Sequence, residues 1–248
     1  MPLKLKDVPT IITILLGFAV IPLAARGSIQ LAGLAVILGG VSDMLDGAIA
    51  RATKTQNKFG AELDLVSDLV IYSLASSVIV FFSLAPISVL LGYCLGVLPL
   101  LFGCLRLARF NVRKIEYPGY WVGLTRPGVA GLITAYFNST IFVAYKPLVL
   151  TAAFVIVVSA LNISLVPYIG HHKRQLSQWQ LAVIALVSCG LVAAAALGHW
   201  WDGLLVVETL YLLSPLTIPH DDRVRLRKFI AAWKAEDSQE ALESQGMD

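Results

Sequence analysis

The sequence predicts an all-α integral membrane protein, a polytopic bundle of transmembrane helices. Hydrophobic residues make up 57% of the 248 residues and charged residues only 14%, whereas about a quarter of the residues of a soluble domain are charged. The mean hydropathy is +0.77. Apolar stretches of about 20 residues, the length that crosses a bilayer as a helix, recur along the chain. No stretch shows the alternating pattern of a membrane β-strand.

Eight stretches are candidate transmembrane helices. The first is longer than the roughly 7–15 residues of a signal-peptide core and has no clear A-x-A cleavage site, so we expect it to be retained. The last is the weakest, because it is short and contains Glu208 and Pro215. In chain order the stretches are Val8–Ala25, Ile29–Ala50, Phe59–Leu84, Ile87–Leu107, Pro127–Tyr145, Leu148–Tyr168, Leu181–Leu197 and Leu204–Ile218.

The distribution of positive charge predicts the orientation of these helices. With the N-terminus inside, Arg26 and Lys146 fall outside and the rest of the 19 lysine and arginine residues fall inside. Because cytoplasmic loops are enriched in these residues, both ends of the chain are expected in the cytoplasm. Residues 1–218 then form the transmembrane domain and residues 219–248 a cytoplasmic tail, with a short surface helix and a disordered end. The net charge of +3 is small, and nucleic acid is not an expected partner.

Two neighbouring stretches contain four carboxylates at helical spacing, within residues 43–68. On a helix with about 100° per residue, Asp43 and Asp46 share one face of the first stretch. Asp64 and Asp68, four residues apart, share one face of the second. If the two faces meet, all four carboxylates converge.

Converging carboxylates in a low-dielectric setting repel one another unless cations neutralise them. All-oxygen ligation suits Mg²⁺ or Mn²⁺, and the absence of nearby histidine or cysteine in the sequence argues against zinc. Four carboxylates can hold two such ions. A two-metal site is suited to displacement at phosphorus, since one ion serves the attacking oxygen and the other the leaving oxygen.

Small residues and one arginine accompany the aspartates. Gly47 and Ala50 lie on the face of Asp43 and leave room for a ligand against the helix backbone, and Gly60 lies on the face of Asp64. Arg51 offers a planar fork to a phosphate group. This stretch is therefore the candidate site.

The whole pattern over residues 43–68, D-x2-D-G-x2-A-R-x8-G-x3-D-x3-D, resembles the signature of the CDP-alcohol phosphotransferases. These membrane enzymes move a phosphatidyl-type group from a CDP-activated lipid to a small alcohol and release CMP. The resemblance implies a six-helix core and a homodimer, and the hydropathy pattern adds about two C-terminal transmembrane helices to that core. The protein is expected in the cell membrane, and the distribution of lysine and arginine predicts that the site faces the cytoplasm. Two ordinary helices with polar packing positions are the alternative.

The resemblance also implies roles for single residues. Asp43, Asp46 and Asp64 would bind the metal ions. Asp68 would bind the second metal and act as the base that takes the proton of the acceptor hydroxyl. The residues expected to line the CDP cleft are Gly47, Ala50, Arg51 and Gly60.

Two further strings indicate the acceptor. RLARFN, at residues 106–111, and the segment 117–127 are similar to strings of the phosphatidylserine synthase branch of the family. Serine brings a carboxylate into a carboxylate-rich site, and arginines are its natural counter-charge. We therefore expect Arg106, Arg109 and Arg126 to bind the acceptor, although arginines at span ends are also common interfacial anchors.

Other functions are compatible with parts of the pattern. Inositol phosphate, glycerol phosphate or choline are alternative acceptors, and arginines suit the phosphate acceptors too. An ion-coupled transporter also uses carboxylates within the membrane, but the sequence shows no inverted repeat. A catalytically inactive scaffold is disfavoured because no position of the signature is missing.

Overall fold

The computed structural model describes residues 8–53, 58–112, 115, 117–170, 187 and 189–245. Nearly all of this part is helical, with one pair of short antiparallel strands in which Trp121 is opposite Tyr168. The elements are α1 (Val8–Ala25), α2 (Ile29–Thr53), α3 (Lys58–Asp68), the π-helix η2 (Leu69–Leu74), α4 (Ala75–Leu84), α5 (Val89–Val112), β1 (Tyr120–Val122), α6 (Arg126–Asn138), α7 (Thr140–Tyr145), α8 (Leu148–Ile163), β2 (Pro167–Ile169), α10 (Trp200–Leu212), the 3₁₀ helix η3 (Ser214–Thr217) and α11 (His220–Gln245).

Four helical segments of the described chain are long and apolar enough to cross a membrane. They agree with the first four predicted stretches. The third is continuous through α3, η2 and α4. The segments are Val8–Ala25, Ile29–Ile49, Phe59–Leu84 and Val89–Val112.

The later stretches differ from the prediction. The expected span Pro127–Tyr145 is broken at Ser139, whose backbone is extended and whose hydroxyl caps α7 by accepting a hydrogen bond from the Phe142 amide. In the stretch Leu148–Tyr168, helix α8 ends at Ile163, and the residues from Pro167 onward form the strand β2. The structure thus does not confirm six core helices plus two more.

The C-terminal stretches also differ. Leu181–Leu197 begins in residues outside the described part. Leu204–Ile218 is divided, because α10 ends at Leu212 and Pro215 lies in the first turn of η3. The surface helix of the tail is longer than expected, since α11 continues to Gln245, whereas residues 246–248 lie outside the described part. Its many Lys, Arg, Glu, Gln and Ala residues favour helix by intrinsic propensity.

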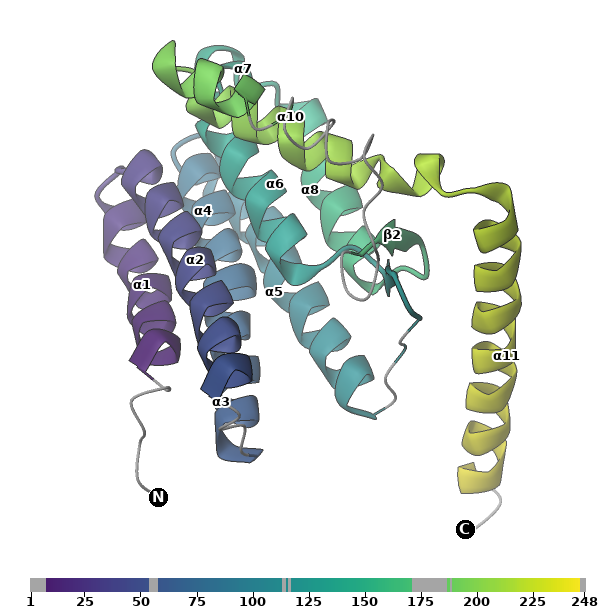
Figure 1. Cartoon of the computed structure of the whole chain (residues 1–248). Helices are drawn as coiled ribbons and strands as arrows, with labels where there is room; N and C mark the ends of the chain where they lie inside the picture. The colour runs from purple at the N-terminus through teal and green to yellow at the C-terminus, as the bar shows by residue number, and fades with distance from the viewer. Residues whose placement is uncertain are drawn as a thin grey trace.

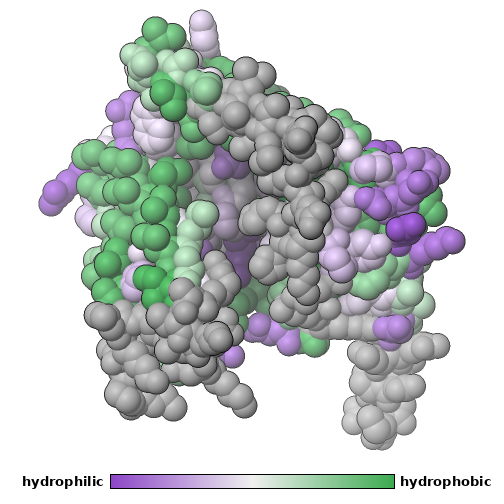
Figure 2. Space-filling view, viewed as in Figure 1, coloured by the Kyte–Doolittle hydropathy of each residue, from purple (hydrophilic) through white to green (hydrophobic). Residues whose placement is uncertain are grey.

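Helix α6 lies at the centre of the bundle (Figure 1), and every residue from Gly128 to Asn138 is buried. It packs against α2, α4, α8 and α10, whereas α1 packs mainly on α2, and α4 packs on α5. Figure 1 shows α11 standing beside the bundle. In Figure 2 hydrophobic residues cover the face formed by α1 and α2, and hydrophilic residues gather on the first turns of α11.

The π-helix η2 lies at a point of close approach between helices. A Cβ atom on Gly39 of α2 would lie 2.3 Å from Cδ1 of Ile71, and one on Gly17 of α1 would lie 2.8 Å from Cγ1 of Val70. Since real Cβ atoms are essentially never closer than 3.0 Å, glycine is needed where α1 and α2 meet η2. This packing fixes the turn that directly follows Asp68.

Candidate active site

A cavity of about 690 Å³ lies between α2, η2, α5, α6 and α10. Charged side chains from several helices line it, namely Asp43, Asp68, Arg106, Arg126 and Glu208. Packing of apolar helices does not require charged side chains between them, and each charge placed there costs desolvation energy. Charged groups inside a membrane protein therefore usually serve its function. This cavity is therefore the candidate active site.

Three of the four predicted aspartates lie together. Ligand oxygens of Asp43, Asp64 and Asp68 all lie within 4.8 Å of one another, and each residue is partly buried. Asp43 comes from α2, and the other two lie one turn apart on α3. The side chain of the fourth, Asp46, is outside the described part, as are those of Ala50 and Arg51. Gly47 and Gly60 lie on α2 and α3, one helical turn from Asp43 and Asp64 respectively.

Tyr72 orients the first aspartate. Its hydroxyl donates a 2.8 Å hydrogen bond to Oδ2 of Asp43. Tyr72 lies in η2, and π-helical turns are rare and often occur at functional sites. Sequence reasoning missed Tyr72, and the only available signal was its position four residues after Asp68.

Arg126 forms an ion pair with Asp68. The Nη2 atom of Arg126 lies 2.8 Å from Oδ2 of Asp68. The side chain of Arg126 is 15% exposed and that of Asp68 is 16% exposed. Arg126 is the first residue of α6, where Thr125 accepts a hydrogen bond from the Gly128 amide and Pro127 occupies the first turn. This helix start is therefore rigidly defined.

Two atoms next to this ion pair have no hydrogen-bond partner in the described part of the chain. They are Oδ1 of Asp68 and Nη1 of Arg126, and both are buried. Buried polar atoms are normally paired. An acceptor and a donor left open beside each other in a cavity indicate a place for a polar ligand or a metal ion.

Arg106 and Arg109 have structural partners. Nη1 of Arg106 donates to the carbonyl oxygens of Val122, at 3.2 Å, and Asn162, at 2.6 Å. Nη1 of Arg109 donates to the carbonyl of Ile163 at 2.5 Å. Both arginines therefore bind the C-terminal end of α8, where helix carbonyls lack intrahelical partners. Arg106 also lines the cavity, whereas Arg109 is not among the lining residues.

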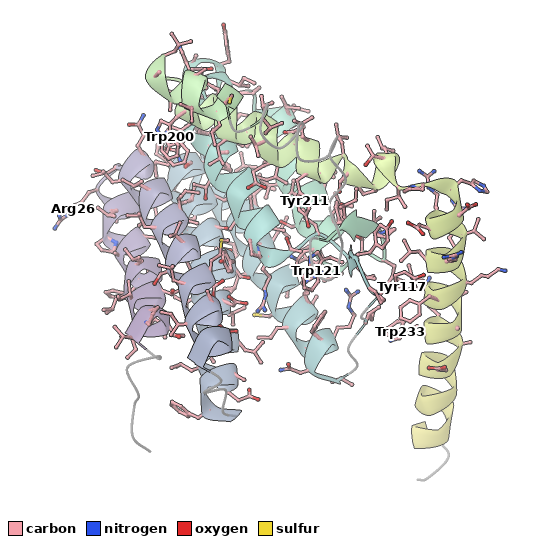
Figure 3. The ribbon with its side chains drawn as sticks, viewed as in Figure 1. Arg26, Tyr117, Trp121, Trp200, Tyr211 and Trp233 are labelled. Atoms are coloured by element: carbon pink, nitrogen blue, oxygen red, sulfur yellow. The ribbon has the colours of Figure 1, made fainter. Side chains whose placement is uncertain are left out.

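Helix α10 supplies a wall that sequence reasoning did not anticipate. Glu208 and Tyr211 line the cavity from this helix, and Trp121 lines it from β1. Figure 3 shows Trp121 and Tyr211 on the side of the bundle that faces β2. No sequence motif marks these positions, because they reach the cavity only through the packing of α10 on α6.

The acidic cluster fits a divalent metal ion. Three carboxylates offer oxygen ligands within 4.8 Å of one another, and Oδ1 of Asp68 is buried without a partner among the described residues. Oxygen-only ligation is what Mg²⁺ and Mn²⁺ prefer.

Comparison with known proteins agrees with this geometry. A model of the CDP-alcohol phosphatidyltransferase family matches residues 5–212. The chain belongs to this family. As a CDP-alcohol phosphatidyltransferase, it is a multi-pass membrane transferase of phospholipid biosynthesis, in a family that uses divalent metal ions.

Several curated relatives carry the name of a serine enzyme. The chain is 28% identical over 205 residues to the CDP-diacylglycerol--serine O-phosphatidyltransferase of Helicobacter pylori, covering 81% of this chain and 84% of the relative. It is 30% identical over 169 residues to the archaetidylserine synthase of Methanothermobacter thermautotrophicus, covering 67% and 70%. It is 34% identical over 138 residues to the serine O-phosphatidyltransferase of Methanocaldococcus jannaschii, covering 54% and 60%.

Proposed function

We propose that this enzyme transfers a phosphatidyl-type group from a CDP-activated lipid to L-serine and releases CMP. The observation that carries the proposal is the ion pair of Asp68 with Arg126, which joins the acidic cluster to a half-buried arginine. The names of the relatives support serine as the acceptor. The cluster suits phosphoryl chemistry and the arginine suits a carboxylate-bearing acceptor.

Asp68 acts as the base in this proposal. The serine hydroxyl oxygen forms a bond to the lipid-bearing phosphorus, while the bond from that phosphorus to the oxygen it shares with CMP breaks. The serine proton passes to Oδ1 of Asp68, which has no partner in the described part of the chain. When bound, two divalent ions, Mg²⁺ or Mn²⁺, would supply charge neutralisation and lower the pKa of the hydroxyl. Asp43, Asp46, Asp64 and Asp68 are the residues that would hold them.

Arg126 orients the acceptor. Its Nη2 holds Asp68, and its Nη1 is open to donate to the serine carboxylate. Arg106 and Arg109 contribute less directly, because their guanidinium groups are bound to backbone carbonyls. Arg106 adds positive charge to the cavity wall and holds the wall in place.

The rest of the proposal concerns the donor lipid and the setting. Gly47, Ala50, Arg51 and Gly60 line the CDP cleft, beside the aspartates with which they share α2 and α3. Residues 1–218 form the catalytic domain and residues 219–248 a cytoplasmic tail. The site faces the cytoplasm at the cell membrane, and the enzyme forms a homodimer.

CMP release by the purified protein tests the reaction. The assay uses detergent micelles with a CDP-lipid and Mg²⁺ or Mn²⁺, and compares L-serine, inositol phosphate, glycerol phosphate and choline. Release that depends on serine is the expected result. Release with one of the other acceptors alone would contradict the serine assignment and leave the family chemistry intact.

A further inference from the structure

Glu208 of α10 lies in the cavity wall at a point where α6 has a glycine and therefore no side chain. Helix α10 runs antiparallel to α6, since Trp201 lies near Asn138 at one end and Tyr211 near Gly128 at the other. Between them, the carboxylate of Glu208 lies against Gly131, where a Cβ atom would come within 2.4 Å of Oε1 and 2.6 Å of Cδ. A Cβ atom at position 131 would force this carboxylate to shift, so glycine permits its observed position.

No cation of the described chain neutralises Glu208. Neither a hydrogen bond nor an ion pair from any described side chain reaches its carboxylate, which lines the cavity. The two arginines that line the same cavity make their contacts with other groups, since Nη2 of Arg126 pairs with Asp68 and Nη1 of Arg106 donates to backbone carbonyls. Glu208 is half-buried. A carboxylate that is withdrawn from water without a partner loses part of its hydration, and a ligand that supplies a cation lowers this cost.

The cavity therefore presents both signs of charge to a ligand. Arg126 offers the open donor Nη1, and Glu208 offers an acceptor from the neighbouring wall. Gly131, which Glu208 contacts, lies five residues after Arg126 on α6, a rise of about 7.5 Å along the helix. Both residues line the same cavity, so a ligand there that carries a carboxylate and an ammonium group has a side chain of opposite charge available for each.

We propose that Glu208 binds the ammonium group of the amino-acid acceptor and thereby sets the acceptor specificity of the enzyme. The proposal rests on the proposed function. Arginines alone do not distinguish serine from a phosphate-bearing alcohol, because both are anionic at one end. Glu208 repels a phosphate acceptor and attracts an amine, so it supplies the discrimination against the wrong substrate that the arginines lack.

A comparison of two acceptors isolates the amine contact. L-Serine and 3-hydroxypropionate share the hydroxyl and the carboxylate, and only serine has the amine. The assay measures CMP release for the wild-type enzyme and for Glu208→Gln, which keeps the shape of the side chain. The matched control is Asp221→Asn, since Asp221 is a 92%-exposed carboxylate on α11.

The expected result is a loss of selectivity. In Glu208→Gln the KM for serine should rise by about tenfold or more, the equivalent of about 1.4 kcal/mol, with a smaller change in kcat. The kcat/KM for 3-hydroxypropionate and the KM for the CDP-lipid should not change, and Asp221→Asn should behave as wild type. A fall that is equal for both acceptors, or no change for either, overturns the proposal.

A second measurement covers the case in which Glu208→Gln does not fold. For the wild-type enzyme, L-alanine should inhibit competitively against serine at least about tenfold more tightly than propionate, which lacks the amine. Equal inhibition would overturn the role of Glu208. Failure of the proposed function is distinct, because the wild-type enzyme would then release no CMP in response to serine.

Discussion

Arg126 at the start of α6 and Asp68 at the end of α3 form a 2.8 Å ion pair that joins the central helix to the acidic cluster. One guanidinium nitrogen and one carboxylate oxygen remain without partners beside it, among the described residues. The pair therefore holds Asp68, the proposed base, in place and leaves one atom of each residue open to a ligand.

Asp68→Asn should remove the base and keep most of the lipid site. CMP release should fall by about 10²–10⁴-fold, the usual contribution of a positioned base. Binding of the CDP-lipid, measured at equilibrium with purified protein, should change much less. If binding falls as far as the rate, Asp68 has a structural role alone.

Arg126→Lys should act on the acceptor. Lysine keeps the charge but loses the second nitrogen, so it cannot pair with Asp68 and donate to the serine carboxylate in the same geometry. The KM for serine should rise by about tenfold or more, while the KM for the CDP-lipid stays close to that of the wild type. An unchanged KM for serine would rule out this contact.

Arg106→Ala should act on stability. The change leaves the carbonyls of Val122 and Asn162 without their buried donor, at a cost of about 1–3 kcal/mol for each unsatisfied group. The melting temperature in detergent should fall clearly. A matched comparison is Arg225→Ala, an exposed arginine of α11, which should leave the melting temperature unchanged.

Tyr72→Phe should weaken metal binding. Without the hydroxyl that orients Asp43, the Mn²⁺ concentration for half-maximal activity should rise by about 10–100-fold, the typical effect of losing a group that orients a metal ligand. The rate at saturating Mn²⁺ should largely recover. Tyr93→Phe is the control, because Tyr93 is 65% exposed on α5. A lower rate at every metal concentration with an unchanged midpoint would contradict the orienting role.

Removal of divalent ions should abolish activity. The carboxylates of Asp43, Asp64 and Asp68 lie together and need cations to hold the phosphates of a CDP-lipid. Treatment with a chelator should stop CMP release, and added Mg²⁺ or Mn²⁺ should restore it. Full activity in excess chelator would show that the cluster is not a metal site.

Local spacing explains what the sequence predicted. The side chains of Asp64 and Asp68 meet on one helical face because residues four apart are neighbours on any helix, and the structure places them with Asp43. Hydropathy likewise predicted the first four spans, since the length of an apolar run is a local property. The later helices were predicted less well, because caps such as Ser139 and strand pairing ended them early.

Contacts between distant segments could not be predicted in the same way. The ion pair of Asp68 with Arg126, the hydrogen bond of Tyr72 to Asp43 and the approach of Glu208 to Gly131 each join different helices. Spacing along one helix carries no information on how two helices cross or which faces meet. The sequence by itself thus determined a membrane protein that carries the aspartate signature of its family. Only the tertiary structure decided which side chains surround it, because helix packing brings residues far apart in the chain into one cavity.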